Sequence, residues 1–208
     1  MTGHELVAFA RSKLGTPYVY GMKGTIMTQA NFNYLQGQYG KKCVWDSDEK
    51  KVGKVCVDCS GLISWATGVV LGSAQLFDRA TKKELIGTIK QAPVGALVWM
   101  KGHVGIYTGV KNGMPYYIAA DGSAYGVREV PLNKNKFTHW LLMDYINYVE
   151  RDDEVVEKSK IIIGGKEFEV DMIRKDGVTY PKLRDIAPLL GFKVGNRGNV
   201  PVIENYQK

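Results

Sequence analysis

The chain has 208 residues, of which 45% are hydrophobic, and a formal net charge of +7. That length suits one ordinary domain with an appendage, and the apolar content is sufficient for a packed core. It contains no apolar run of about 18 residues, so we expect no transmembrane helix. The N-terminus has neither the basic start nor the apolar segment of a signal peptide, so action outside the cell would require release by another route or a trimmed chain.

The charge is unevenly distributed along the chain. Residues 1–149 hold 17 Lys and Arg against 10 Asp and Glu, residues 150–158 hold two against five, and residues 159–208 hold nine against six. The basic first part favours a polyanionic partner, namely nucleic acid, anionic lipid or an anionic wall polymer, or else it serves solubility alone. The distribution predicts a domain over 1–149, a linker over 150–158 and a small accessory domain over 159–208.

Helices dominate the first part of the prediction. Thr2 and Glu5 form a capping box ahead of apolar residues at helical spacing, and Gly15 is a suitable stop. An extended aromatic stretch follows over 16–21. Residues 22–55 are polar and lack convincing periodicity, so we expect a long loop there. Further helices are predicted over 59–71 and 82–91.

Strands dominate the part after residue 93. Short β-rich segments separated by Gly, Asn and Lys turns lie at 96–100, 103–108, 116–120, 127–130 and 140–149. Helices followed by an antiparallel sheet form the α+β pattern, in which the helix from residue 59 packs on the sheet. The tail predicts a small α+β unit with a hairpin at Gly164 and Gly165, a helix over 180–191, and strands at 192–194 and 200–203.

Two residues point to nucleophilic chemistry. Cys59 stands where a turn runs into a helix, and the unpaired amides and the helix dipole there favour the thiolate. His103 opens a predicted strand, so it would be a rigidly held base for the thiol proton. Together they indicate a cysteine hydrolase.

The other cysteines leave alternatives open. Cys56 and Cys59 form a C-x-x-C motif, but its surroundings fit neither a redox site nor a zinc site. A disulfide between Cys43 and Cys56 would require an oxidising compartment, and the sequence does not decide it. We expect no metal and no cofactor.

Three motifs occur in an order that resembles the NlpC/P60 family of cell-wall cysteine peptidases. They are Pro-Tyr-x-Tyr-Gly at 17–21, Asp-Cys-Ser-Gly-Leu at 58–62 and Gly-His-Val-Gly-Ile-Tyr at 102–107. The resemblance covers residues 4–149 and implies a papain-like α+β fold. Segments 124–127 and 138–140 resemble the phage-lysin-like branch of the family. The tail is similar to the small stalk-type domains found at the N-terminus of copper amine oxidases, without any copper ligands.

The resemblance also implies roles for individual residues. Cys59 would attack the peptide carbonyl, with His103 as base and then acid, and the amide of Cys59 would help to hold the oxyanion. Asp58 would bind the free amine of the first amino acid of the substrate. The substrate-binding residues as a group would be Asp58, Ser60, Tyr18 and Tyr20.

One position departs from the family pattern. The third catalytic residue, a polar group that orients the imidazole, falls at Ala119, which cannot orient anything. Asp121, two residues along on the same strand face, is the candidate that we place third in the catalytic set. The alternatives are a backbone carbonyl or water, an impaired site and, more remotely, His139.

The implied function is a peptidoglycan hydrolase that cleaves an amide bond of the stem peptide at the bacterial cell wall. The expected bond is the one between D-γ-glutamate and the diamino acid. The lysin-like segments and the missing signal peptide suggest a phage or prophage origin. The alternatives are an N-acetylmuramoyl-L-alanine amidase, a catalytically impaired wall-binding module and an acyl-transfer enzyme. The expected partners are the stem peptide and an anionic wall polymer, without nucleic acid or membrane insertion. Residues 159–208 would bind the wall or mediate dimers.

Overall fold

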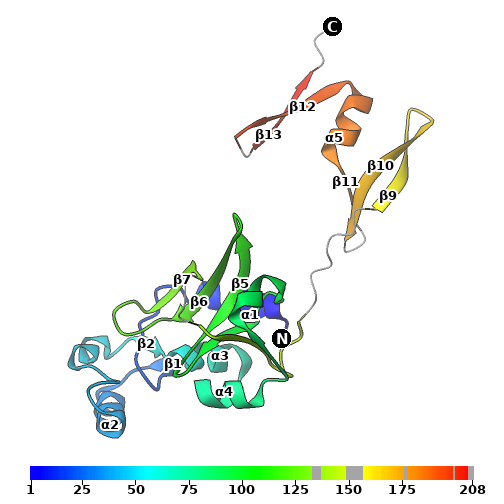
Figure 1. Cartoon of the computed structure of the whole chain (residues 1–208). Helices are drawn as coiled ribbons and strands as arrows, with labels where there is room; N and C mark the ends of the chain where they lie inside the picture. Colours follow the sequence, from blue (N-terminus) through cyan, green and yellow to red (C-terminus); the bar gives the residue numbers. More distant parts are fainter. Residues whose placement is uncertain (133–136, 149–156, 176–177, 199, 206–208) are drawn as a thin grey trace. The chain divides into compact units, whose positions relative to one another are not determined.

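The computed structural model describes residues 1–132, 137–148, 157–175, 178–198 and 200–205 (Figure 1). The chain divides into two compact units, Met1–Val149 and Glu150–Lys208. Most of the linker predicted over 150–158 lies outside the described residues, and residues 157 and 158 belong to a strand. In these described ranges, no helix has the length and apolar character needed to cross a membrane.

The first unit holds a six-stranded antiparallel sheet and a two-stranded one, and α2 lies apart from the larger sheet (Figure 1). Its helices are α1 (Gly3–Ser12), α2 (Gln29–Tyr39), η1 (Asp46–Lys51), α3 (Cys59–Thr67), α4 (Ser73–Arg79) and η2 (Ile86–Gln91). Its strands are β1 (Lys23–Ile26), β2 (Val55–Val57), β3 (Lys82–Leu85), β4 (Leu97–Met100), β5 (His103–Lys111), β6 (Met114–Ala120), β7 (Val127–Pro131) and β8 (His139–Leu142). Six of these strands form one sheet in the order β3-β8-β4-β5-β6-β7, and β1 pairs with β2.

The two faces of the six-stranded sheet bury different clusters. Side chains alternate between faces along a strand, so Val104 and Ile106 of β5 share a core with Leu62 of α3. Tyr107, the residue after Ile106, points to the opposite face and packs there with Trp140. The α+β class and the packing of the helix from residue 59 on the sheet are therefore confirmed.

The capping box at the start of the chain is confirmed. The hydroxyl of Thr2 accepts a hydrogen bond from the Glu5 amide at 3.1 Å, and the Glu5 carboxylate accepts one from the Thr2 amide at 2.7 Å. Helix α1 ends at Ser12, before Gly15. Gly15 adopts a left-handed φ of 82°, and its amide donates to the Val127 carbonyl at 2.9 Å, which ties the turn to β7.

The prediction of a loop over 22–55 is wrong, because this segment contains β1, α2 and η1. Thr28 caps α2, and its hydroxyl accepts from the Asn31 amide at 3.1 Å. Only Phe32 and Leu35 of α2 are buried. Two apolar anchors in eleven residues give too weak a helical periodicity to be recognised in the sequence.

Two further boundaries differ from prediction. The helix predicted over 59–71 ends at Thr67, because Gly68 takes the left-handed conformation and caps α3, and α4 then begins at Ser73. The helix predicted over 82–91 is instead strand β3 followed by η2. Strand β3 pairs with β8, so a tertiary contact overrides the local pattern.

A buried ion pair connects the 22–55 segment to the rest of the first unit. Lys51 Nζ lies 2.6 Å from Asp48 Oδ1 and donates to the carbonyls of Tyr18 at 2.7 Å and Ser123 at 2.9 Å. The Ser123 hydroxyl donates to Asp48 Oδ2 at 3.0 Å. These bonds fix the stretch that carries Tyr18 and the turn that follows Asp121.

The second unit is small. It contains β9 (Glu157–Ile163), β10 (Lys166–Lys175), β11 (Val178–Pro181), α5 (Leu183–Ile186), η3 (Ala187–Leu190), β12 (Phe192–Arg197) and β13 (Val200–Asn205). The hairpin at Gly164 and Gly165 is confirmed, with Ile163 opposite Lys166. The helix predicted over 180–191 is shorter than expected, because β11 takes residues 180 and 181. Among the described residues of this unit, the buried apolar side chains are Val170, Met172 and Ala187, so its core is slight.

Candidate active site

Asp58 and Cys59 lie at the junction where β2 runs into α3. Asp58 is the N-cap of α3, and its carboxylate accepts a hydrogen bond from the Gly61 amide. That amide is one of the first-turn donors that have no acceptor within a helix. Cys59 is the first helical residue and is 7% exposed. Cys59 is therefore almost fully buried at the positive end of α3.

Opposing effects act on the pKa of the Cys59 thiol. Burial raises the pKa of Cys59 to about 11, and the neighbouring Asp58 carboxylate acts in the same direction. The amides of Val104 and Ser60 and the Lys23 ammonium lower this pKa without outweighing the rise. The Ser60 amide at the helix start acts on the sulfur in the direction that the sequence predicts, while burial and Asp58 oppose it. A base must remove the proton during the reaction.

His103 and Asp121 meet across two neighbouring strands. His103 Nε2 lies 3.1 Å from Asp121 Oδ1, and the Asp121 side chain is fully buried. The reason is register: Ile106 of β5 pairs with Ile118 of β6, and the same antiparallel pairing carried on places residue 103 opposite residue 121. With Nε2 directed to the carboxylate, Nδ1 is the ring nitrogen that is left for a thiol proton.

Arg128, which the sequence reading missed, neutralises Asp121. Its Nε donates to Asp121 Oδ2 at 2.7 Å, a second guanidinium nitrogen also contacts this oxygen, and the Tyr117 hydroxyl donates to it at 3.3 Å. Arg128 pairs with Ala119 in the register of β6 and β7, and paired residues share a sheet face. The small side chain of Ala119 thus leaves room for the guanidinium to reach Asp121.

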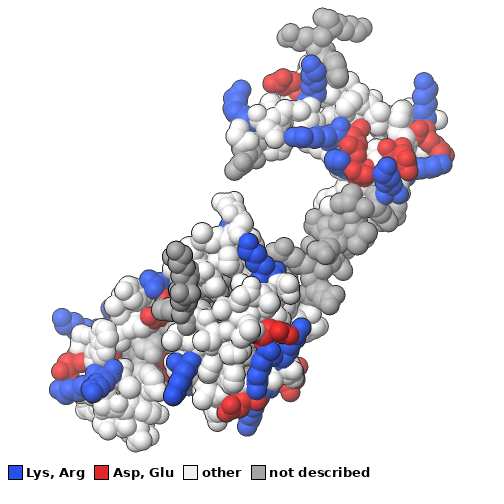
Figure 2. Space-filling model, in the orientation of Figure 1, with Lys and Arg blue, Asp and Glu red and all other residues white. Residues whose placement is uncertain are grey.

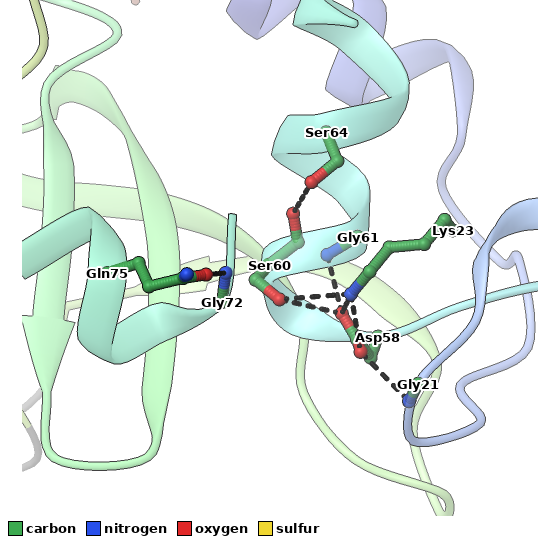
Figure 3. A network of polar contacts seen from close by, with 8 residues as sticks. All are labelled: Gly21, Lys23, Asp58, Ser60, Gly61, Ser64, Gly72 and Gln75. Carbon is green, nitrogen blue, oxygen red and sulfur yellow. Dashed lines mark hydrogen bonds and ion pairs between the residues drawn. The ribbon is translucent and has the colours of Figure 1, made fainter. Parts of the chain in front are cut away.

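A second polar network surrounds Asp58 (Figure 3). Lys23 Nζ donates to Asp58 Oδ1 at 3.1 Å, to Oδ2 at 3.0 Å and to Ser60 Oγ at 3.3 Å. The Ser60 hydroxyl donates to Asp58 Oδ1 at 3.1 Å, and the Gly21 amide donates to Oδ2 at 2.9 Å. Asp58 and Ser60, predicted to contact substrate, are therefore bonded to the protein itself. Lys23 was also missed, since it lies in the segment without periodicity.

These residues line a cavity of about 230 Å³ next to the nucleophile. Its wall contains Tyr20, Gly21, Lys23, Tyr39, Asp58, Cys59, Ser60, Gly72, Ser73 and Gly102. Tyr20 and Tyr39 pack edge to face with centroids 5.0 Å apart. Burial raises the pKa of Tyr18, with Cys59 and Asp58 adding to the rise, which is the effect of a phenol held close to the thiol. Of the predicted site residues, Tyr20, Asp58 and Ser60 line the cavity with Cys59. His103 and Asp121 do not line it, and the His103 ring stacks on Phe137 with centroids 5.8 Å apart.

Two alternatives from the sequence are not supported. His139 packs against Phe77 of α4 and Trp99 of β4, with ring centroids 5.3 and 6.1 Å away. His103 instead contacts Asp121. All three cysteines are free thiols, including Cys43 and Cys56. Across the part of the chain that the structure describes, no three His, Cys, Asp or Glu side chains cluster as a metal site would require.

The basic charge of the first unit is dispersed on the face drawn in Figure 2. Its Lys and Arg side chains form several separate groups there, with acidic side chains beside them. Exposed ion pairs account for part of this mixture, such as Lys41 with Asp46 at 3.0 Å. That face offers no single basic patch, and an anionic wall polymer as partner stays a prediction.

No protein-family profile and no curated protein matches the chain. Among solved structures, the chain is similar to the peptidoglycan hydrolase RipB of Mycobacterium tuberculosis, at 23% identity over 67% of this chain and 63% of that one, with a TM-score of 0.46. It is similar to the P60 domain of an antigen from M. avium subspecies paratuberculosis, at 25% identity over 68% and 93%, with a TM-score of 0.45. It is also similar to the NlpC/p60 domain of the peptidoglycan hydrolase SagA, at 23% identity over 69% and 100%, with a TM-score of 0.43.

The match thus spans less than two thirds of the RipB chain. Since all three TM-scores are under 0.5, these likenesses carry no functional weight. The function proposed below depends on the residues of this chain.

The Asp58→Asn variant tests the electrostatic account of the thiol. Asparagine keeps the cap but removes the charge that raises the pKa of Cys59, so the thiolate fraction at pH 8 increases. We expect iodoacetamide to alkylate Cys59 about threefold faster or more, as followed by mass spectrometry of the Cys59 peptide. Asp46→Asn, an exposed change of the same kind, should leave the rate unchanged. Equal or slower alkylation in Asp58→Asn would contradict the account.

The Ala119→His variant tests whether the packing at residue 119 requires a small side chain beside Arg128. Ala119 is 1% exposed and pairs with Arg128 in the sheet, so an imidazole there has to displace its neighbours. We expect a loss of about 1–3 kcal/mol in the free energy of unfolding, measured by urea denaturation, as for other overpacked cores. Ala124→His, at an exposed position, is the matched control. Unchanged or increased stability of Ala119→His would contradict this account of the packing around Arg128.

Proposed function

We propose that the first unit is a cysteine amidase of the NlpC/P60 type that hydrolyses an amide bond in the stem peptide of peptidoglycan. Cys59 is the nucleophile, His103 the general base and then acid, and Asp121 the carboxylate that orients the imidazole. The observation that carries the proposal is the contact of His103, the first residue of β5, with the buried carboxylate of Asp121. The amide of the next residue, Val104, hydrogen-bonds to the Cys59 sulfur. The substrate class comes from the motif resemblance.

The acylation half-reaction follows from the protonated thiol. As the Cys59 sulfur attacks the carbonyl carbon and the S–C bond forms, His103 Nδ1 takes the thiol proton. First-turn amides of α3, which lack intrahelical acceptors, stabilise the oxyanion. The imidazolium then protonates the leaving amine, the C–N bond breaks, and a thioester remains on Cys59.

Hydrolysis of the thioester uses the same groups. Water attacks the carbonyl carbon, His103 takes a proton from it, and the proton returns to sulfur as the C–S bond breaks. Asp121 stabilises the imidazolium in both halves by its bond to Nε2. Arg128 is a positioning residue, because it holds Asp121 and balances its buried charge.

The contact between His103 and Asp121 weighs against an impaired wall-binding module, since that alternative was motivated by the alanine at 119. The D-γ-glutamyl–diamino-acid bond is the cleavage site that we favour, and N-acetylmuramoyl-L-alanine amidase activity is the alternative. Wall binding or dimerisation by residues 159–208 stays a prediction, as does a phage origin.

Digestion of purified peptidoglycan by the wild-type protein and by Cys59→Ala and Asp121→Asn tests the function. We expect the wild type to release fragments whose masses identify the bond, Cys59→Ala to release none, and Asp121→Asn to be slower by about a hundredfold or more. Cys43→Ala and Asp144→Asn, which change the same residue types at positions with no proposed role, should retain activity. Release by Cys59→Ala, or none by the wild type, would overturn the proposal.

A further inference from the structure

The carboxylate of Asp58 has no acceptor capacity left for a substrate. Its Oδ1 accepts from the Gly61 amide, the Ser60 hydroxyl and Lys23 Nζ, and its Oδ2 accepts from the Gly21 amide and Lys23 Nζ. A carboxylate offers about four lone-pair positions, so these five contacts saturate it. Asp58 therefore cannot accept a further hydrogen bond from the substrate amine that the family resemblance assigns to it.

Lys23 is fixed in this place. It comes from β1, and its stem lies over the first turn of α3, where a Cβ added at Gly61 would meet Lys23 Cδ at 3.2 Å. The side chain is 31% exposed and lines the cavity together with Cys59. The ammonium of Lys23 therefore lies in the wall of the cavity, held by Asp58 and Ser60.

A substrate ammonium in this position would be unfavourable for two reasons. It would lose its water without gaining a carboxylate partner, and it would meet a like charge at close range. A nitrogen that carries an acyl group is neutral at any ordinary pH, so it suffers neither penalty.

We propose, resting on the function proposed above, that Lys23 makes this cavity select stem peptides whose first nitrogen is acylated and reject peptides with a free amine. In peptidoglycan that nitrogen is acylated while the peptide is attached to the glycan, and it becomes a free amine once an amidase has released the peptide. The enzyme would therefore act before such an amidase step, on attached peptides.

Lys23 has a second effect that is measurable without substrate. Its ammonium lowers the pKa of Cys59 and so opposes Asp58. A Lys23→Met variant leaves Asp58 to act alone, and alkylation of Cys59 at pH 8 should become slower. Lys23→Arg, which keeps the charge, should alkylate at close to the wild-type rate.

Binding of two matched peptides tests the selection. The probes are L-alanyl-D-γ-glutamyl-diaminopimelyl-D-alanine with its first amine free and the same peptide with that amine acetylated. Their dissociation constants are measured by calorimetry on the full chain carrying Cys59→Ala, alone and combined with Lys23→Met, Lys23→Arg or Lys160→Met. We expect the acetylated peptide to bind about tenfold tighter to Cys59→Ala, a preference that Lys23→Met abolishes or reverses because Asp58 becomes available. Lys23→Arg and the remote control Lys160→Met should keep it.

Equal affinity for the two peptides, tighter binding of the free amine, or binding of neither overturns the selection by Lys23. Turnover of the same peptides by the wild-type protein reports on the proposed function separately. Selective binding without any cysteine-dependent cleavage would overturn the hydrolase proposal and leave the selective cavity in place. Cleavage that favours the free amine would leave the hydrolase and overturn the selection.

Discussion

The geometry of the site depends on the hydrogen bonds and the ion pair of the Asp58 carboxylate. It caps α3 through the Gly61 amide, holds the turn at Gly21, and pairs with Lys23 of β1. Two separate parts of the chain, residues 21–23 and the start of α3, are joined at one buried charge, one residue before the nucleophile. Loss of that charge would change the start of α3, the wall of the cavity and the electrostatics of Cys59 at the same time.

The same charge has a chemical consequence. Burial raises the pKa of Cys59, and the negative charge of Asp58 beside the sulfur raises it further. A raised pKa means that the proposed reaction needs a base to take the thiol proton. This makes His103 and its support by Asp121 and Arg128 essential to the proposed reaction, and it distinguishes this site from one in which a thiolate is already formed at rest.

The sequence predicted those parts of the fold and site whose signals are local. The capping box at Thr2 and Glu5 locates α1, and short β-rich segments between turns locate most strands of the sheet. The parity of β6 identifies Asp121 as the group on the same face as Ala119. Cys59 and His103 follow from short motifs. Each of these inferences depends on residues that are neighbours in the chain.

The missed features depend on contacts between distant segments. Lys23 lies 35 residues before Asp58 and has no local feature that marks it as a partner. Arg128 reaches Asp121 only because β6 and β7 pair in one register, which a single sequence does not reveal. Helix α2 was missed because it buries only two side chains, so its anchoring depends on the small core around Phe32 rather than on its own pattern.

The most direct test of the account is a search for the covalent intermediate on Cys59. Wild-type protein mixed with excess stem peptide is quenched in acid within the first turnovers, digested, and analysed by mass spectrometry. The account predicts a Cys59 peptide that carries the N-terminal part of the substrate as a thioester, and this adduct should be removed by neutral hydroxylamine. Accumulation of cleaved product without any adduct on Cys59, in a wild-type reaction that His103→Ala does not slow, would contradict it.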